Sequence, residues 1–321
     1  MNFGKGHHLH LIDGSAFIFR AYHALPPLTR KSDGLPIGAV SGFCNMLQRY
    51  VETNTGPDAP THVAVIFDKG SHTFRNDLYD QYKANRDEMP QDLRPQMPLT
   101  REATRAFNIA CEEMVGYEAD DIIATLAVQA RDAGGRVTII SSDKDLMQLV
   151  GKCAEPDDGV AEGGCIDMLD TMKNARIYIE EVEEKFGVPP EKVGDVLALM
   201  GDSVDNIPGI FGVGPKTASR LIAEHGGLTA ALDAAEGMKK SKLKERLLEY
   251  RADAELSRVL VTLREDCGLP VSLDDMKLDQ VPSEPLAAFL GKHGFSSLLK
   301  RLEAGNGSPS RTTDLDPAKR D

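Results

Sequence analysis

Three short runs of apolar residues, each followed by polar residues, organise the first half of the chain. They are residues 8–12, 61–67 and 136–140, and each is rich in the aliphatic and β-branched residues typical of a buried strand. Between them, apolar residues recur with the 3.6-residue period of a helix, as in 40–51 and 122–130. This alternation of strands and helices predicts an α/β fold with a parallel sheet.

The rest of the chain departs from this pattern. Residues 74–106 are polar and basic, contain three prolines and lack a continuous apolar face, so we expect them to project as a helical excursion or long loop. From Val193 onward, helical patterns are punctuated by glycine and proline, and the composition after Gly305 is that of a disordered segment. We therefore predict an α/β core over 1–185 that includes the excursion at about 70–105, a helical subdomain over 186–303, and a disordered tail or linker over 304–321.

Acidic residues follow directly after each of the three predicted strands. Asp13 follows the first strand, Asp68 the second, and Asp143 and Asp145 the third. Because functional groups gather at the carboxyl ends of parallel strands, we expect these side chains to converge on one edge of the sheet. One such acid alone is commonly a turn residue or a helix cap, but three positions in register favour a functional site.

Two further acidic groups lie at the ends of predicted helices. Glu118, Asp120 and Asp121 open one helix, whereas Asp202 and Asp205 follow the end of another. The helix dipole favours acids at an N-terminus, which explains one or two members of the first group. The same dipole disfavours acids at a C-terminus, so a purely structural role is less easily assigned to the second group.

Nine carboxylates brought together without cations would repel one another strongly. Mg²⁺ or Mn²⁺, which are hard ions with all-oxygen ligands, would relieve that repulsion. The chain has no HExxH motif and no Cys/His cluster, so a zinc site is not expected. Two divalent ions would activate water and stabilise the leaving oxygen of a phosphodiester. The net charge of −13 argues only superficially against nucleic acid, since setting the nine acids aside leaves −4.

A glycine-rich segment, GIFGVGPKTA, follows the last acidic pair. It is not a Walker A loop, because Pro215 separates Gly214 from Lys216 and a helix precedes it. Glycines permit a tight turn with exposed N–H groups, and proline suits the first position of the next helix. A plain turn between helices is the alternative, but the context favours a helix-hairpin-helix that holds a DNA phosphate without reading bases. Its predicted DNA-binding residues are Gly212, Val213, Gly214, Lys216 and Thr217.

Basic side chains are the other candidates for contact with nucleic acid. Lys83 and Arg86 lie in the excursion directly after Tyr82, and aromatic and cationic side chains together hold unpaired bases and backbones. Arg20 lies near the first predicted strand. A basic run at 239–246 is either a solvated helix face or a second contact with DNA.

Five scattered cysteines suggest a reducing compartment. Their number is odd and no CxxC pair occurs, so we expect reduced thiols and a cytoplasmic protein. The N-terminus lacks an apolar signal segment, and no apolar run is long enough to cross a bilayer.

These motifs closely resemble those of the 5′-nuclease domain of bacterial DNA polymerase I, within the flap endonuclease family. The resemblance runs from about Leu9 to Leu302. The matching stretches are LIDGSAFIFRAYHALPPL, VIFDKGSHTFR, YKANRDEMP, GYEADDIIATLA, SSDKDLMQLV and LALMGDSVDNIPGIFGVGPKTA. The resemblance implies a PIN-like parallel sheet flanked by helices, with the excursion as a helical arch and a C-terminal helix-hairpin-helix subdomain.

The resemblance also implies a role for each candidate residue. The acids would bind two or more divalent ions, and they are Asp13, Asp68, Glu118, Asp120, Asp121, Asp143, Asp145, Asp202 and Asp205. Lys83 and Arg86 would be catalytic residues on the arch that contact the scissile phosphate, with Arg20 nearby. Tyr82 would stack on a base. The hairpin would bind duplex DNA, and often K⁺ through backbone carbonyls.

The implied function is that of a structure-specific 5′-3′ exonuclease and flap endonuclease in DNA replication and repair. It would be monomeric, need Mg²⁺ or Mn²⁺, have no membrane partner, and cut DNA at 5′ flaps, nicks or 5′ ends, including RNA primers in RNA–DNA hybrids. One alternative is a non-catalytic DNA-junction binder, which the complete set of acids disfavours. Another is a PIN-type ribonuclease, which the hairpin and the pair Asp202 and Asp205 disfavour.

Two features stand apart from the resemblance. The stretch from Cys153 to Cys165 is longer than the usual connection in the family, and it has no assigned role. The linker-like tail fits either a stand-alone exonuclease or the N-terminal part of a polymerase.

Overall fold

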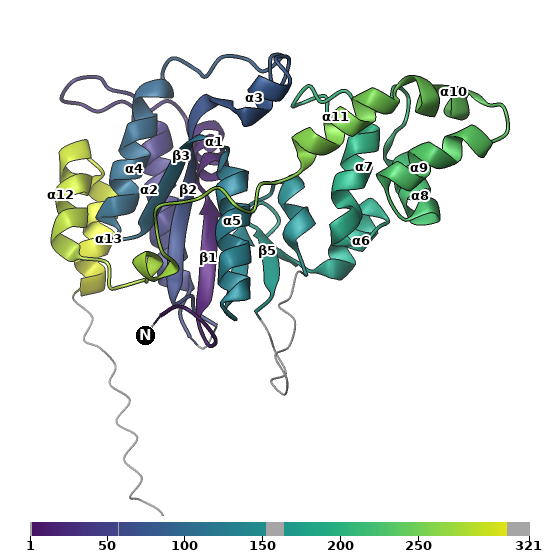
Figure 1. The fold of residues 1–321 in the computed structure, drawn as a ribbon. Helices are drawn as coiled ribbons and strands as arrows, with labels where there is room; N and C mark the ends of the chain where they lie inside the picture. The colour runs from purple at the N-terminus through teal and green to yellow at the C-terminus, as the bar shows by residue number, and fades with distance from the viewer. Residues whose placement is uncertain (1, 57, 152–163, 307–321) are drawn as a thin grey trace, which may run out of the picture.

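A mixed sheet forms the centre of the computed structural model, which describes residues 2–56, 58–151 and 164–306 (Figure 1). In this part of the chain the sheet has six strands in the order β3-β2-β1-β4-β5-β6. The first five pair in parallel and β6 runs antiparallel to β5. The strands are β1 (His8–Asp13), β2 (His62–Thr73), β3 (Ala110–Gly116), β4 (Arg136–Ile140), β5 (Ile166–Asp170) and β6 (Ala175–Ile177).

The three predicted strands correspond to β1, β2 and β4, which form the buried middle of the sheet. The outer strands were not predicted, because acidic residues interrupt the apolar patterns of β3 and β5, and β6 has only three residues. Glu112 and Glu113 lie within β3, and Asp167 and Asp170 lie within β5. Strands that are buried on both faces have continuous apolar runs, whereas strands near an edge of the sheet often do not.

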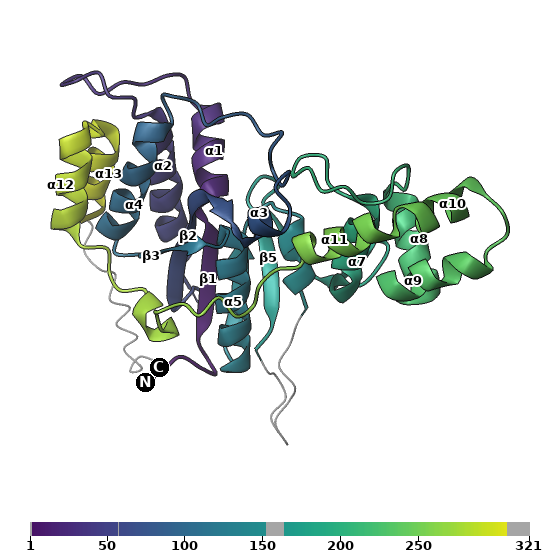
Figure 2. The same cartoon turned by 45° about the horizontal axis from the view of Figure 1, so that its top comes forward.

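Helices cover both faces of the sheet (Figures 1 and 2). Leu9 and Leu11 of β1 pack on the face covered by α5, whereas Ile12 packs on the face covered by α1, α2 and α4, as expected for a side-chain period of two. The core helices are α1 (Gly14–Ala24), α2 (Gly38–Thr53), α3 (Phe74–Leu78), α4 (Met97–Ala106), α5 (Ala119–Asp132) and α6 (Ile179–Phe186). The later helices are α7 (Val193–Met200), α8 (Pro215–His225), α9 (Leu228–Ala234), α10 (Lys242–Glu249), α11 (Arg251–Val261), α12 (Ser283–His293) and α13 (Ser296–Asn306).

Short 3₁₀ segments connect several of these helices. They are η1 (Arg94–Gln96), η2 (Asp145–Leu149), η3 (Pro190–Lys192), η4 (Ala235–Gly237) and η5 (Leu273–Met276). The helix predicted over 122–130 lies within α5, which begins at Ala119, and the helix that Asp202 and Asp205 were expected to follow is α7.

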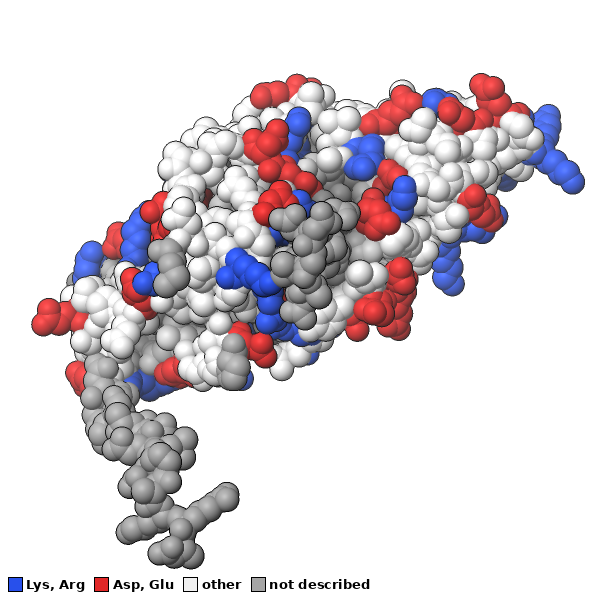
Figure 3. Space-filling model, turned by 60° about the horizontal axis from the view of Figure 1, so that its bottom comes forward, with Lys and Arg blue, Asp and Glu red and all other residues white. Residues whose placement is uncertain are grey.

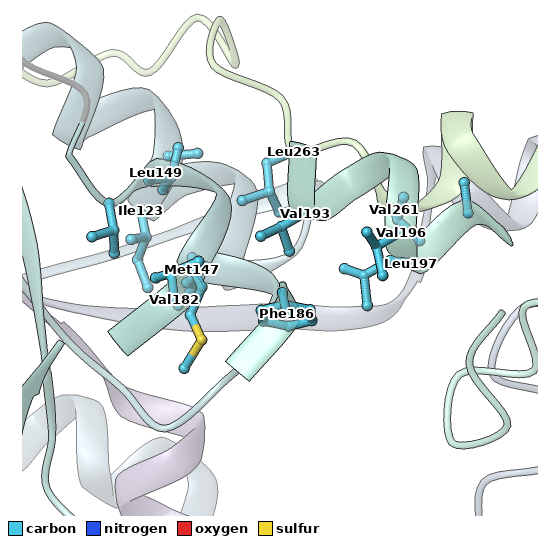
Figure 4. Packing of buried hydrophobic residues seen from close by; sticks show 14 of the residues in the cluster. Ile123, Met147, Leu149, Val182, Phe186, Val193, Val196, Leu197, Val261 and Leu263 are labelled. Atoms are coloured by element: carbon cyan, nitrogen blue, oxygen red, sulfur yellow. The ribbon is translucent and has the colours of Figure 1, made fainter. Parts of the chain in front are cut away.

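One apolar cluster joins the α/β core to the helices that follow it (Figure 4). Ile123 of α5 and Met147 of η2 lie in the same cluster as Phe186 of α6, Leu197 of α7 and Val261 of α11. Full burial of each such side chain contributes about 1.5–3 kcal/mol relative to exposure. Helix α7 is therefore held firmly against the core, and so is the acidic loop that follows it.

The last two helices do not belong to the predicted helical subdomain at 186–303. Helices α12 and α13 return to the core and lie beside α4, at the opposite end of the molecule from α8, α9 and α10 (Figure 1). Leu286, Phe289 and Leu298 are buried there with Phe43 of α2. Helix α13 continues to Asn306 and so extends into the segment predicted as a disordered tail, of which 307–321 lies outside the described residues.

The projecting segment is shorter than the predicted excursion. Residues 79–93 run in turns and loops between α3 and η1, while α4 packs against α2 and α12. Thr100, Ala103 and Thr104 are fully buried on α4. The prediction placed α4 in the projection because two of these buried residues are polar, which conceals its apolar face.

The thiol prediction holds for part of the chain. Cys44, Cys111 and Cys267 are free thiols, whereas Cys165 is disulfide-bonded, so the expectation of reduced thiols was wrong for it. Cys153 and most of the stretch from 153 to 165 lie outside the described residues.

The face where the strands begin carries interspersed acidic and basic side chains (Figure 3). Within the described ranges, no helix has both the length and the apolarity that crossing a membrane requires.

Candidate active site

The carboxyl edge of the sheet holds two acids in a hydrogen-bonded frame. Asp13 ends β1 and caps α1, where its Oδ1 accepts the backbone N–H of Ala16 at 2.9 Å. Its Oδ2 accepts the hydroxyl of Ser141 at 2.8 Å, and the Ser141 Oγ in turn accepts the N–H of Asp143 at 3.0 Å. These bonds fix the ends of β1 and β4 to one another.

Asp68 joins the next strand to the acidic end of α5. Its Oδ2 accepts the Ser15 hydroxyl at 2.6 Å, and its Oδ1 accepts the backbone N–H of Ala119 at 2.9 Å. Ala119 is the first residue of α5 and lies between Glu118 and Asp120. One carboxylate thus aligns the ends of β2, α1 and α5.

A cleft of about 380 Å³ opens at this edge of the sheet. Six of the nine predicted acids line it together with three basic side chains. The lining residues are Asp13, Ser15, Ala16, Phe19, Asp68, Lys83, Arg86, Glu118, Ala119, Asp120, Ser142, Asp143, Lys144 and Asp205. Acids from five separate segments of the chain therefore meet in one cavity.

Asp145 and Asp202 lie beside this lining. The N–H of Asp145 donates to Asp143 Oδ1 at 2.8 Å, and Lys144 forms an ion pair with Asp202. Burial, followed by the neighbouring charge of Asp143, raises the pKa of Asp145 to about 7. Its Oδ1 is a buried oxygen for which the described residues supply no hydrogen-bond donor.

Crowding and burial perturb the acids at the bottom of the cleft. Burial raises the pKa of Asp13 to about 6 and outweighs the hydrogen bonds from Ala16 and Ser141, which lower it, while the charges of Asp68 and Asp143 make smaller raising contributions. Burial and then the charges of Asp143 and Asp13 raise the pKa of Asp120 well above its ordinary value. The described residues provide no hydrogen-bond partner for the Asp120 carboxylate. This part of the site therefore lacks positive charge.

Basic side chains from the projecting segment cover the other side of the cleft. Lys83 Nζ lies 2.5 Å from Glu118 Oε1 and 3.6 Å from Asp205 Oδ2, and Arg86 pairs with Asp205. Burial alone would lower the pKa of Lys83, but Glu118 and Asp205 raise it above its ordinary value. Lys83 is therefore a cation held over the acids.

The projecting segment is also fastened through its backbone to the loop after α7. Lys83 has a φ of +57°, and its N–H donates to the Asp205 carbonyl at 2.9 Å. The Asn85 side chain donates to the Ser203 carbonyl at 2.7 Å, and the Asn206 side chain donates to the Gln81 carbonyl at 2.7 Å. The position of Lys83 is thus set by the same loop that carries Asp202 and Asp205.

No ready-made metal cage is formed by the described residues: no group of three or more His, Cys, Asp or Glu side chains is arranged to hold an ion. Ion pairs occupy part of the acids. Lys83, Arg86 and Lys144 occupy oxygens of Glu118, Asp205 and Asp202 that would otherwise be free for coordination.

Three predicted site residues do not reach the cleft. Tyr82 is 4% exposed and donates its hydroxyl to Glu118 Oε2 at 3.0 Å, so its ring is not available to stack on a base. Arg20 donates to the Thr171 carbonyl at 2.8 Å and does not line the cavity. Asp121 is fully buried and binds Arg75 instead. Packing, which local sequence does not reveal, determines the direction of each side chain.

The predicted hairpin connects the acidic loop to α8. Pro215 occupies the first turn of α8, as predicted, after a turn in which Gly212 has a φ of +75°. Gly214 and Lys216 are exposed and Thr217 is half-buried. Val213 is 3% exposed, and its N–H donates to the Ile210 carbonyl at 2.9 Å, so it anchors the turn and offers neither side chain nor N–H to a ligand.

Several residues of the site were not among the predicted ones. Ser15 and Ser141 orient Asp68 and Asp13, and each lies within two residues of a predicted acid or strand end, which was a usable signal. Phe19 is 40% exposed at the cleft, although a helical aromatic is usually a core residue. Lys144 lies between two predicted acids in SDKD.

An acid-lined cleft at the carboxyl edge of an α/β sheet, under a basic arch and next to a helical hairpin, defines a nuclease fold. Two family models match the chain: the 5′-3′ exonuclease N-terminal resolvase-like domain over residues 8–187, and the 5′-3′ exonuclease C-terminal SAM fold over residues 188–284. The chain therefore belongs to the 5′-3′ exonuclease family and is a nuclease.

Two relatives illustrate this membership. The chain is 54% identical over 301 residues to a DNA polymerase I of Rhizobium leguminosarum, a match that covers 93% of this chain and 28% of that protein. It is 36% identical over 295 residues to a 5′-3′ exonuclease of Aquifex aeolicus, covering 92% of this chain and 95% of that protein. The chain thus spans between a quarter and a third of the DNA polymerase I relatives and nearly all of the Aquifex exonuclease.

Solved structures share the fold. The T5 D15 protein, co-crystallised with metal ions, superposes with a TM-score of 0.65 at 20% identity, covering 92% of this chain and 98% of that one. The catalytic core of Rad2 in complex with DNA substrate superposes with a TM-score of 0.56 at 17% identity, covering 94% and 93%.

Proposed function

We propose that this chain is a structure-specific 5′ nuclease that hydrolyses phosphodiester bonds at 5′ flaps, nicks and 5′ ends of DNA, including RNA primers paired with DNA. One observation carries the proposal: acids from five segments crowd into a single cleft under two basic side chains of the arch, Lys83 and Arg86. Cleavage of this kind serves DNA replication and repair.

Divalent ions fit the acids of the cleft. The buried, unpaired Oδ1 of Asp145 and the unpartnered carboxylate of Asp120 are the kind of oxygen that Mg²⁺ prefers, with Mn²⁺ as a substitute. The residues that would hold the ions are Asp13, Asp68, Glu118, Asp120, Asp143, Asp145, Asp202 and Asp205. When bound, two such ions supply an activated water and charge stabilisation at the leaving oxygen.

The side chains of the protein have distinct tasks in this scheme. Ser15 and Ser141 hold Asp68 and Asp13 in fixed orientations through short hydrogen bonds. Lys83 and Arg86 are the cations that contact the scissile phosphate, since both side chains line the cleft. A phosphate that enters replaces Glu118 and Asp205 as their partner, so the acids become free for metal when substrate arrives.

The hairpin holds the duplex part of the substrate. Its exposed residues Gly212, Gly214 and Lys216 offer a close backbone approach, the positive end of α8 and one cation to a phosphate. Backbone carbonyls of the same turn are proposed ligands for K⁺. Such contacts position DNA irrespective of its sequence.

The test of this proposal is a cleavage assay with three labelled substrates: a 5′-flap duplex, a blunt duplex and single-stranded RNA. The 5′-flap duplex should be cut fastest in Mg²⁺, and chelation with EDTA should stop cleavage until the metal is restored. A junction-binding protein would bind the flap without cutting it. A ribonuclease would prefer the RNA, and activity that persists in EDTA would overturn the metal mechanism.

Gly214→Val should weaken duplex binding about tenfold or more, because a lost hydrogen bond to a charged group costs about 1.5–3 kcal/mol. Apart from its two chain neighbours, no described residue places an atom within 4 Å of a Cβ added at Gly214, so the free protein tolerates it while a phosphate does not. At Gly212 the same substitution would strain the backbone, whose φ is +75°, and would also displace the Arg246 guanidinium, so its effect on DNA binding would be less specific.

Fluorescence anisotropy with two duplexes of unrelated sequence measures this effect. Gly291→Val on α12 is the matched control, since a Cβ there also meets nothing within 4 Å but lies far from the hairpin (Figure 1). A loss of affinity confined to one of the two DNA sequences would contradict binding through phosphates.

A further inference from the structure

A buried ion pair lies directly behind the acidic end of α5. Arg75 of α3 is 2% exposed and Asp121 of α5 is fully buried. Arg75 Nη1 donates to Asp121 Oδ2 at 2.6 Å, and Nη2 donates to Oδ1 at 2.8 Å. Two parallel bonds of this type fix the relative orientation of both groups as well as their distance.

The remaining donors of Arg75 reach two other parts of the chain. Its Nε donates to the Leu260 carbonyl at 2.7 Å, and Nη2 also donates to the Thr262 carbonyl at 3.2 Å, both at the end of α11. Nη1 lies 3.4 Å from Glu118 Oε2. All five N–H groups of a guanidinium thus have partners, and they join the root of the arch to α5 and to the end of α11.

Asp121 is saturated in the same way. Besides Arg75, its Oδ1 accepts the backbone N–H of Arg264 at 3.0 Å, and its Oδ2 accepts the backbone N–H of Glu118 at 3.1 Å. A carboxylate offers about four lone-pair sites, and four donors already occupy them. Asp121 therefore has no lone pair left for a metal ion, in contrast to its neighbour Asp120.

We propose that Arg75 and Asp121 are a positioning pair, not members of the metal-binding set, and that they hold the arch, the acids of α5 and the hairpin subdomain in one arrangement. This inference rests on the proposed nuclease function. The pair fixes the turn that presents Glu118 and Asp120 and the root of the arch that carries Lys83. Through Arg75, the pair also binds backbone carbonyls at the end of α11, which packs on α7 next to the acidic loop.

Titration of the full chain with Mn²⁺ alone separates a ligand from a positioning residue. Asp121→Asn should bind the same number of Mn²⁺ ions as the wild type, because the carboxylate makes no contact with them. Asp120→Asn, one residue away, should lose Mn²⁺ binding. A loss of Mn²⁺ by Asp121→Asn equal to that of Asp120→Asn would overturn the inference.

Single-turnover cleavage of a 5′ flap provides the second readout. Asp121→Asn and Arg75→Gln should each lower the maximal rate by roughly 10²-fold, the effect of a displacement of about 1 Å at the reacting groups, with little change in the dissociation constant for DNA. The double variant should be no slower than the slower single variant, because both changes break one unit. Rate losses that multiply would show two independent roles and refute the pair.

Arg75→Lys keeps the test decisive if the Asn or Gln variants do not fold. Lysine retains the charge but cannot form the paired bonds, so this variant should bind Mn²⁺ normally and still cleave slowly. An unchanged rate in Arg75→Lys would overturn the inference. Failure of the proposed function is distinguishable, since the wild type itself would then leave the flap uncut.

Discussion

Asp120→Asn is expected to lower the maximal single-turnover rate of flap cleavage by roughly 10³-fold, which corresponds to about 4 kcal/mol of transition-state stabilisation. The side chain lines the cleft and lacks a protein partner among the described residues, so its charge is available to a divalent ion. Binding of the flap should persist, because removing a negative charge also reduces repulsion with phosphate.

The same substitution should stabilise the protein when metal is absent. Asp120 is half-buried with Asp143, Asp13, Glu118 and Asp68 around it, and their charges repel its own. Replacing it with a neutral group of the same shape removes that repulsion, so thermal unfolding in EDTA should shift upward by a few degrees. Loss of activity together with a gain in stability is expected of a functional acid and is not expected of a structural one.

Asp253→Asn is the matched control for both measurements. Asp253 is also a half-buried aspartate in the first turn of a helix, α11, but it lies outside the cleft. Its substitution should leave the rate of cleavage unchanged and should not raise the unfolding temperature. If Asp120→Asn instead weakens flap binding enough to account for the whole loss of rate, the metal-binding role of Asp120 is wrong.

The central strands and their acids could be predicted because the signals were local and repeated. A run such as HLHLI is buried on both faces of a parallel sheet, and the acid at its end follows from the topology. The return of α12 and α13 to the core could not be predicted. It depends on contacts of Leu286 and Phe289 with helices almost two hundred residues earlier in the chain, and no local pattern encodes that partner.

The different roles of Asp120 and Asp121 could have been predicted from the sequence. Successive residues on a helix point about 100° apart, so two neighbouring acids cannot both face the same ion. What the sequence could not supply was the partner: Arg75 lies 46 positions away, and its burial shows only in the folded chain. Tyr82 is an example of the opposite kind. Its position beside cations suggested a functional role in stacking on a base, but its side chain is buried in the core.

Lys83→Ala should reduce the maximal rate of single-turnover cleavage by roughly 10²-fold or more, the usual effect of removing one preorganised charge donor. Its ammonium is held over the acids by Glu118 and Asp205, and its backbone is fixed by the loop after α7. It therefore meets the scissile phosphate as negative charge builds in the transition state. Such stabilisation lowers the barrier without a proportionate change in ground-state affinity.

Two comparisons make this assignment specific. Lys69→Ala removes the same charge from β2 at an exposed position where Lys69 pairs with Glu113, and it should leave the rate unchanged. Lys83→Ala should also bind Mn²⁺ at least as tightly as the wild type, because the lysine no longer competes for Glu118. A fall in Mn²⁺ affinity would mean that Lys83 organises the acids and does not act on the phosphate.

A single experiment that measures the dissociation constant and the maximal rate together should distinguish the role of the arch from that of the hairpin. Gly214→Val removes duplex contacts remote from the reacting phosphate, so its dissociation constant should rise while its rate at saturating protein stays near that of the wild type. Lys83→Ala should show the opposite, with a low rate and nearly normal affinity, because many phosphate contacts remain. If Lys83→Ala raises only the dissociation constant, Lys83 is a docking residue. The catalytic charge over the cleft would then have to come from Arg86, the other cation of the arch, which pairs with Asp205, or from Lys144, which also lines the cleft.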